Sequence, residues 1–194
     1  MKVAILDTGT ANIRSIHSAI QRLGVSATIT SDALVIAMAD RVILPGVGHA
    51  GHVMAQLRER GLDAVISALE QPILGICLGM QLLASSTEEG PTTCIGRIPG
   101  FVQRLDSRLA TVPHTGWNQI NGCAGPLFVG IPEGAWMYFV HSYATPVDAS
   151  TTAVCTHGLQ FSAARSLGNV HGVQFHPERS GDGGFQLLSN FLQL

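Results

Sequence analysis

The sequence predicts an α/β fold with a mostly parallel, open central sheet flanked by helices and an added antiparallel section. Three features indicate this fold. Short apolar runs alternate with amphipathic helical patterns through the first 85 residues, as they do in βαβ units. The apolar runs are continuous, which is typical of strands buried on both faces of a parallel sheet. After about residue 90, short β-rich segments separated by Gly, Pro and Asn replace the helical patterns.

The first half of the chain predicts four strands and the helices between them. The expected strands are residues 3–6, 27–30, 42–44 and 73–76. After the first strand, Asn12 is the predicted N-cap of a helix that carries Ile13, Ile16 and Ile20 on one face and ends before Gly24. Further helices are expected at 31–34, at about 52–60, at about 62–69 and directly after Cys77.

The second half predicts antiparallel strands and hairpins added to the same sheet. These segments are residues 100–104, 136–140, 153–155, 161–165 and 170–175. A pair of glycines, Gly183 and Gly184, precedes a final amphipathic helix over 185–192. The sequence contains no internal repeat, low-complexity tract or linker, so we expect residues 1–194 to form a single domain.

Composition excludes several classes of protein. Hydrophobic residues make up 46% of the 194 residues, which argues against disorder. The net charge of −2 gives no electrostatic reason to expect nucleic acid or an anionic membrane as a partner. Only 12% of residues are charged, which indicates a surface that is uncharged or covered by a partner. Four cysteines without CxxC spacing, and an N-terminus that predicts a strand and no secretory leader, favour a reduced, cytoplasmic protein.

Cys77 lies at the junction of the strand over 73–76 and the following helix, with Gly75 and Gly79 two residues away on either side. A sharp strand-to-helix turn crowds the backbone around its apex, and glycines at these positions relieve the crowding. The turn directs one side chain out of the sheet, and the helix N-terminus favours the negative thiolate, which is the reactive form. This arrangement is typical of a nucleophile elbow. The alternative for any single cysteine is a buried structural thiol.

A thiol nucleophile needs a base, and the base needs an orienting group. Among the eight histidines, His176 alone combines a predicted strand end, a following proline and a nearby carboxylate, Glu178. The residues therefore predict a Cys77–His176–Glu178 triad. His49 and His52 have a spacing that could bind a metal, but no third ligand is evident, and we expect neither metal nor cofactor.

These residues also match a known family. The stretches Gly75-Ile-Cys-Leu-Gly-Met-Gln81 and Gly172-Val-Gln-Phe-His-Pro-Glu178 resemble the two motifs of the class I (triad) glutamine amidotransferases, in the right order. Four further stretches are similar to one branch, the glutaminase subunits of imidazole glycerol phosphate synthase in histidine biosynthesis. They are residues 9–15, 45–48, 113–118 and 139–143.

The resemblance implies an activity and roles for several residues. Cys77 would attack the side-chain amide of glutamine, with His176 as base and acid, and a thioester would be hydrolysed to glutamate after ammonia leaves. The oxyanion would be held by the N–H of Leu78 and by a backbone N–H at Val47 or Gly48. The substrate-binding residues implied by the family pattern are Gly46, Gln81, His141, Ser142 and Tyr143.

The resemblance also implies a partner, a cyclase subunit with a (β/α)8 barrel that receives the ammonia in a heterodimer. Residues suited to such an interface are Asn12, Trp117, Asn118, Trp136 and Tyr138. The alternatives are a class I glutaminase of another pathway (anthranilate, pyridoxal phosphate or purine synthesis), a cysteine hydrolase or redox protein with a similar elbow, and a non-catalytic binding subunit.

Overall fold

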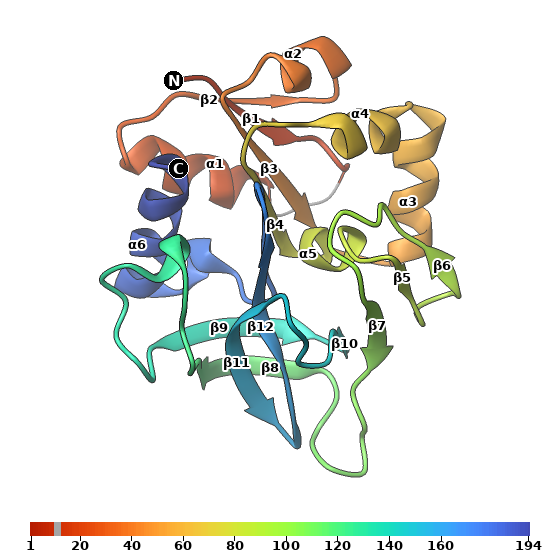
Figure 1. Ribbon diagram of the computed structural model, residues 1–194, viewed down its shortest axis with the longest axis vertical. Helices are drawn as coiled ribbons and strands as arrows, with labels where there is room; N and C mark the ends of the chain where they lie inside the picture. The colour runs from red at the N-terminus through yellow and green to blue at the C-terminus, as the bar shows by residue number, and fades with distance from the viewer. Residues whose placement is uncertain (10–12) are drawn as a thin grey trace.

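The computed structural model describes residues 1–9 and 13–194 (Figure 1). Within these ranges, seven strands form the largest sheet, in the order β11-β12-β13-β4-β3-β1-β2. Its strands are β1 (Val3–Leu6), β2 (Ala27–Thr30), β3 (Arg41–Gly46), β4 (Ile73–Cys77), β11 (Thr151–His157), β12 (Leu159–Leu167) and β13 (Val170–Val173). Strands β1 to β4 and β13 pair in parallel, while β12 is antiparallel to both β11 and β13. This confirms the predicted fold class.

Helices cover both faces of this sheet. They are α1 (Ile13–Arg22), α2 (Ala33–Ala37), α3 (Ala50–Glu59), α4 (Leu62–Ala68), α5 (Leu78–Leu82) and α6 (Gly181–Leu192). Figure 1 shows α1 and α6 on one side of the central strands and α3, α4 and α5 on the other. The predicted N-cap Asn12 lies outside the described residues, whereas Asp32 caps α2 by accepting two backbone N–H groups.

The continuous apolar strands supply two cores because successive side chains of a strand point to opposite faces. Val3 and Ile5 of β1 pack in the core beside α1 and α6. Ala4 and Leu6 pack in the core beside α3 and α4. Full burial of a Val, Ile or Leu side chain contributes roughly 1.5–3 kcal/mol, so both faces of the sheet are held by many such contacts.

The antiparallel section differs from the prediction. We expected its strands to extend one sheet, but in the described residues only β11, β12 and β13 join the main sheet, and β13 pairs with β4 in parallel. A second sheet has the order β10-β7-β5-β6, and β8 pairs with β9 as a two-stranded ribbon. Their bounds are β5 (Ser86–Thr87), β6 (Thr92–Thr93), β7 (Phe101–Arg104), β8 (His114–Gln119), β9 (Trp136–His141) and β10 (Tyr143–Ala144). Two-residue strands are too short to show a hydrophobic period, and β8 contains a glycine and an asparagine, which are depleted in strands.

The start of the last helix was also predicted wrongly. The helix begins at Gly181, so Gly183 and Gly184 lie inside it. A Cβ atom at Gly184 would lie 2.1 Å from the carbonyl oxygen of Pro177. The glycine therefore allows the first turn of α6 to pack directly on the backbone of the short 3-10 helix η2 (Pro177–Arg179). Another 3-10 helix, η1 (Pro126–Phe128), also contacts α6.

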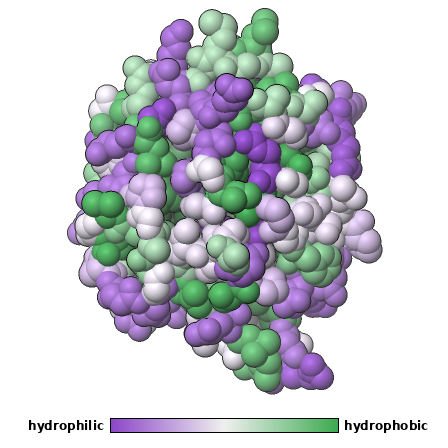
Figure 2. Space-filling view, in the orientation of Figure 1, coloured by the Kyte–Doolittle hydropathy of each residue, from purple (hydrophilic) through white to green (hydrophobic). Residues whose placement is uncertain are grey.

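Charged residues make up 12% of the sequence. On the face seen in Figure 2, apolar residues lie in small groups among polar ones. In the ranges 1–9 and 13–194, no helix combines the length and the hydropathy needed to cross a membrane. Cys77, Cys94, Cys123 and Cys155 are all free thiols.

Candidate active site

The backbone at Cys77 makes the sharp turn that the sequence predicted. Strand β4 ends at Cys77 and α5 begins at Leu78. Cys77 has φ 55° and ψ −111°, and no other non-glycine residue in the described part of the chain has a positive φ. Such a conformation costs of order 1–3 kcal/mol and persists only where the surrounding packing imposes it.

The glycines on either side of Cys77 are required by close backbone approaches. A Cβ atom at Gly79 would lie 1.8 Å from the carbonyl oxygen of Leu44, and one at Gly75 would lie 2.7 Å from the backbone of Gly79 and Met80. The first turn of α5 therefore rests directly on strands β3 and β4. This confirms the local geometry predicted for a nucleophile elbow.

His176 reaches the elbow from the neighbouring strand. Strand β13 pairs in parallel with β4, with Val173 opposite Ile76, so the residues that follow the two strands emerge at the same edge of the sheet. His176 Nδ1 lies 2.9 Å from Glu178 Oε1, and the side chains are 3% and 0% exposed. The imidazole is also hydrogen-bonded to Cys77. Since Nδ1 faces the carboxylate, Nε2 is the nitrogen that faces the sulfur.

The surroundings of His176 have opposing effects on its proton. Burial lowers the pKa of His176, but the hydrogen bonds to Cys77 and Glu178 and their negative charges raise it, and the net result is a pKa of about 10. A perturbed imidazole between a thiol and a carboxylate is the arrangement expected of a nucleophile and its base.

The backbone around His176 is held by β9. The N–H of His176 donates to the carbonyl of Tyr138 at 2.9 Å, and Ser180 Oγ donates to the carbonyl of His176 at 2.6 Å. Ser180 Oγ also accepts the N–H of Tyr138 at 3.0 Å. Pro177 follows His176 as the first residue of η2. These contacts hold the backbone that carries the imidazole of His176.

A cavity of about 310 Å³ opens above the elbow. It is lined by Val47, Gly48, Cys77, Leu78, Gln81, Glu89, Pro113, Val140, His141, Ser142 and Tyr143. Eight of these residues were predicted site residues. His176 and Glu178 are not among the lining residues, and their side chains are only 3% and 0% exposed.

Gly46 differs from the other predicted substrate-binding residues. It pairs with Cys77 across β3 and β4 and is buried. A Cβ atom there would lie 2.9 Å from Leu78 Cβ and from the N of Gly79. Gly46 therefore packs under the elbow and is not among the described residues that line the cavity.

Three lining residues were not among the predicted site residues: Glu89, Pro113 and Val140, the last two of which lie in the family-like stretches 113–118 and 139–143. Glu89 lies between the two-residue strands β5 and β6, and its Oε2 accepts the N–H of Ala50 at 2.7 Å. The loop Glu88-Glu89-Gly90 has no motif that would mark it as part of a site. Only the folding of the small sheet against the N-terminus of α3 brings this carboxylate to the cavity.

His141, which lines the cavity, is hydrogen-bonded to a second buried histidine, His114. His141 Nδ1 donates to the carbonyl of Tyr143 at 2.9 Å, and His114 Nδ1 lies 3.0 Å from His141 Nε2. Burial lowers the pKa of His141 to about 3 and that of His114 to about 4, so both rings are neutral near pH 7.

Asn118, predicted to suit an interface, uses its side-chain amide inside the molecule. Its Nδ2 lies 3.2 Å from His114 Nε2 and donates to the carbonyl of Thr156 at 3.0 Å.

The described part of the chain contains no group of three or more His, Cys, Asp or Glu side chains arranged to hold a metal ion.

Comparison with known proteins agrees with this geometry. The family model "Glutamine amidotransferase class-I" matches residues 4–194. The chain is 50% identical to the imidazole glycerol phosphate synthase subunit HisH of Yersinia pseudotuberculosis, with 100% of both chains covered. It is 48% identical to subunit HisH 1 of Vibrio vulnificus, with 100% of this chain and 98% of the relative covered.

Solved structures resemble the fold at lower identity. A structure titled glutamine amidotransferase matches with a TM-score of 0.78 and 19% identity, covering 98% of this chain and 97% of that one. A structure of PurLQS from Thermotoga maritima matches with a TM-score of 0.68 and 19% identity, covering 99% of this chain and 97% of that one. Because the family model extends over nearly the whole chain and the relatives match it from end to end, this protein belongs to the class I glutamine amidotransferase family.

Proposed function

We propose that this chain is the glutaminase subunit of an imidazole glycerol phosphate synthase, which releases ammonia from glutamine for histidine biosynthesis. The observation that carries the proposal is the hydrogen-bonded series of thiol, imidazole and carboxylate at the base of a cavity of about 310 Å³. The identity of 48–50% to HisH subunits favours this pathway over anthranilate, pyridoxal phosphate or purine synthesis.

The first half of the reaction forms a thioester. His176 Nε2 takes the proton of the Cys77 thiol, and the sulfur attacks the carboxamide carbon of glutamine. As the tetrahedral intermediate collapses, the C–N bond breaks and His176 gives its proton to the departing ammonia. Glu178, 2.9 Å from Nδ1, holds the ring orientation and stabilises the imidazolium that forms between these steps.

The second half repeats these steps with water. His176 takes a proton from the water that attacks the thioester, and then returns that proton to the sulfur as glutamate leaves. Each intermediate carries a negative oxygen that needs N–H donors. We assign this role to Leu78 N–H, next to the nucleophile, and to a backbone N–H at Val47 or Gly48, both of which line the cavity. Loss of one such donor typically costs about 10²–10³-fold in rate.

Substrate recognition requires groups for the α-ammonium and the α-carboxylate of glutamine. The carboxylate of Glu89 is suited to the ammonium group, and its presence in the wall of the same cavity as Gln81 and Tyr143 supports this role. The backbone at His141, Ser142 and Tyr143 lines the same cavity and offers hydrogen-bonding groups. We assign Gly46 a supporting role, because it lets β3 pack against Leu78 and Gly79 beside the cavity.

The exposed face of the β8–β9 ribbon supports a docking site for the cyclase partner. Trp117 and Trp136 are 52% and 56% exposed, and Val140 on the same face also lines the cavity. The guanidinium of Arg179 lies 4.1 Å from the ring centre of Tyr138, whose carbonyl holds the backbone of His176. A (β/α)8 barrel covering this face would receive ammonia where it is formed. Asn12, also considered for this interface, lies outside the described residues.

Two further proposals concern the whole chain. Residues 1–194 form one domain, because strand β13 from the end of the chain lies between β4 and β12 and completes the same sheet. The protein works in the cytoplasm, because all four of its cysteines are free thiols, as in a reducing compartment.

The test is to isolate the chain from its native cells with its partners and to measure glutamate release. We expect a cyclase subunit to copurify, and we expect glutaminase activity to rise by orders of magnitude when the cyclase binds its own ligand. Copurification with an anthranilate, pyridoxal phosphate or purine enzyme would instead assign the chain to that pathway. Equal activities of the isolated subunit and of the complex would contradict the proposal that the partner activates the glutaminase.

A further inference from the structure

Gln174 is a fully buried side chain directly beneath the reactive cysteine. It follows the end of β13, and its backbone N–H still donates to Ala163 of β12 at 2.8 Å. Its relative exposure is 0%. A long polar side chain is rarely buried to this extent unless its amide is fully hydrogen-bonded.

The amide of Gln174 contacts two residues of the site. Its Nε2 donates to Cys77 Sγ at 3.7 Å, and its Oε1 accepts from Gln81 Nε2 at 3.0 Å. Only this orientation satisfies both contacts. If the amide were turned over, its oxygen would face the sulfur, which is negative during the reaction, and its nitrogen would face the nitrogen of Gln81.

The orientation of Gln81 follows from the same contacts. Its Nε2 donates one hydrogen to Gln174 and the other to the carbonyl of Tyr143 at 2.9 Å. The Tyr143 carbonyl also accepts from Nδ1 of His141, whose Nε2 in turn accepts from His114. Both N–H groups of Gln81 are thus used within the protein, and its oxygen is left for the cavity.

We propose that Gln174 is a further functional residue of this site, which stabilises the Cys77 thiolate with an N–H bond and fixes Gln81 with its oxygen toward the substrate. The inference rests on the proposed glutaminase function and deepens it. Gln81 then offers an acceptor, which suits the α-ammonium of glutamine together with Glu89. The α-carboxylate must be bound by other donors, such as backbone N–H groups of the cavity wall.

The main test is Gln174→Met, which keeps the length of the side chain and removes both polar contacts. In the complex with its synthase partner, we expect kcat to fall about 10- to 100-fold, the range for losing a hydrogen bond to a charged group. Alkylation of Cys77 by iodoacetamide should slow near pH 7, and the midpoint of its pH–rate profile should move upward by about one unit. KM for glutamine should rise as well.

Gln81→Met separates the two roles. It removes the group that faces the substrate and leaves the bond from Gln174 to the sulfur, so KM should rise while the alkylation profile stays within about 0.3 units of the original, which is about twofold in thiolate stability. If Gln174→Met does not fold, Gln174→Asn has the same expected outcome, because its amide is one methylene too short to make either contact.

The matched control is Ser162→Ala. Ser162 is also fully buried, and its hydroxyl bonds Pro146 and Thr151 away from the cavity. This variant should lose stability and keep kcat, KM and the alkylation profile. A folded Gln174→Met or Gln174→Asn protein with kcat and alkylation within twofold of the original would overturn the inference. Absence of glutamine turnover by the unaltered complex would overturn the proposed function instead.

Discussion

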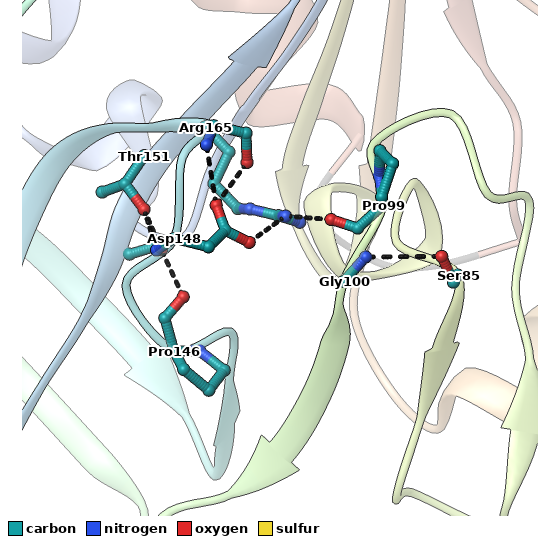
Figure 3. A network of polar contacts seen from close by, with 9 residues as sticks. Ser85, Pro99, Gly100, Pro146, Asp148, Thr151 and Arg165 are labelled. Carbon is teal, nitrogen blue, oxygen red and sulfur yellow. Dashed lines mark hydrogen bonds and ion pairs between the residues drawn. The ribbon is translucent and has the colours of Figure 1, made fainter.

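The Arg165–Asp148 pair and the His176–Glu178 pair both place a cationic side chain beside a carboxylate with little access to water. Arg165 is 1% exposed and Asp148 34%, while His176 and Glu178 are 3% and 0% exposed. Figure 3 shows the Arg165 guanidinium between the carboxylate of Asp148 and the carbonyl of Pro99, with Gly100 beside it. The two pairs differ in whether the cationic side chain can lose its proton.

Arginine keeps its charge at every accessible pH, and both hydrogen-bond partners of the Arg165 guanidinium are oxygens that only accept. The pair therefore joins β12 to the loop before β11, and the bond from Arg165 to the carbonyl of Pro99 joins β12 to the loop before β7, which belongs to the second sheet. His176 instead lies between a carboxylate and a thiol, so its imidazole can accept a proton and give it up again during the reaction. A buried charge therefore marks a reactive site only when its proton is transferable and a cavity adjoins it.

The largest effect should come from Cys77→Ala. Without the sulfur no thioester can form, and loss of a nucleophile typically costs about 10⁴–10⁶-fold in kcat. Glutamate release by the complex measures the loss, while the thermal midpoint should stay near that of the unaltered protein. Asp148→Asn is the comparison variant from the other pair and should keep turnover within a few-fold. Equal activity losses in the two variants would abolish the distinction between the pairs.

Glu178→Gln should have the next largest effect. The amide cannot stabilise an imidazolium and can force the wrong tautomer, so kcat should fall about 10²–10⁴-fold. The pKa of His176, about 10 here, should also fall, because Glu178 is one of the groups that raise it. NMR titration of the imidazole measures this shift. A kcat within threefold of the original would show that the carboxylate has no part in the reaction.

Arg165→Met should lower the stability of the protein and leave its activity unchanged, the reverse of the result expected for Cys77→Ala. It leaves the carbonyl of Pro99 and the partly exposed carboxylate of Asp148 without their donor, at a cost of about 2–4 kcal/mol in the free energy of unfolding. Urea titration measures this cost. Glutamine turnover per folded molecule should remain unchanged; a tenfold loss of turnover would place Arg165 in the chemistry.

Mild acid should weaken the region around the cavity and spare the Arg165 pair. Burial lowers the pKa of His114 to about 4 and of His141 to about 3, below the usual value of 6.5. At these two histidines the unfolded chain binds more protons than the folded one below pH 6.5, so the stability that they contribute is complete above that pH and is lost as the pH falls toward 4. We expect a loss of about 2–4 kcal/mol in urea unfolding between pH 7 and pH 5.

The pKa of Asp148 is lowered, because the bonds from Ser150 and Arg165 outweigh its burial, so its contribution is lost only in stronger acid. His114→Gln should therefore reduce the pH dependence between 7 and 5, and Asp148→Asn should leave it unchanged. The opposite result would mean that the histidines are already charged at pH 7.

Gly100→Ala should have the smallest effect. Gly100 has φ +149°, and a Cβ atom there would lie 2.7 Å from Arg165 Nη2. The cost should be about 1–2 kcal/mol in the free energy of unfolding, since part of it is the unfavourable φ and part is the displaced guanidinium. In the Arg165→Met background the second part should vanish, which a double-mutant cycle measures. Strict additivity would show that the two residues do not interact.

Much of the site could be predicted because its signals are local. Gly75, Cys77 and Gly79 lie within five residues, and the elbow depends on backbone crowding within that span. The apolar runs of β1 to β4 and the helices between them were predicted for the same reason. Glu89 was missed because it reaches the cavity only through the folding of the small sheet, whereas Pro113 and Val140 lie in family-like stretches but were not assigned a place in the site.

The fold class, the elbow at Cys77 and the pairing of His176 with Glu178 could be predicted, because each depends on local patterns or on residues a few positions apart. Which polar side chains meet depends instead on how the chain folds. Gln174 contacts Cys77, His114 contacts His141, and Arg165 contacts Asp148 through the arrangement of strands from distant parts of the chain. A buried polar group must find a partner wherever packing places it, and that placement is a property of the folded chain.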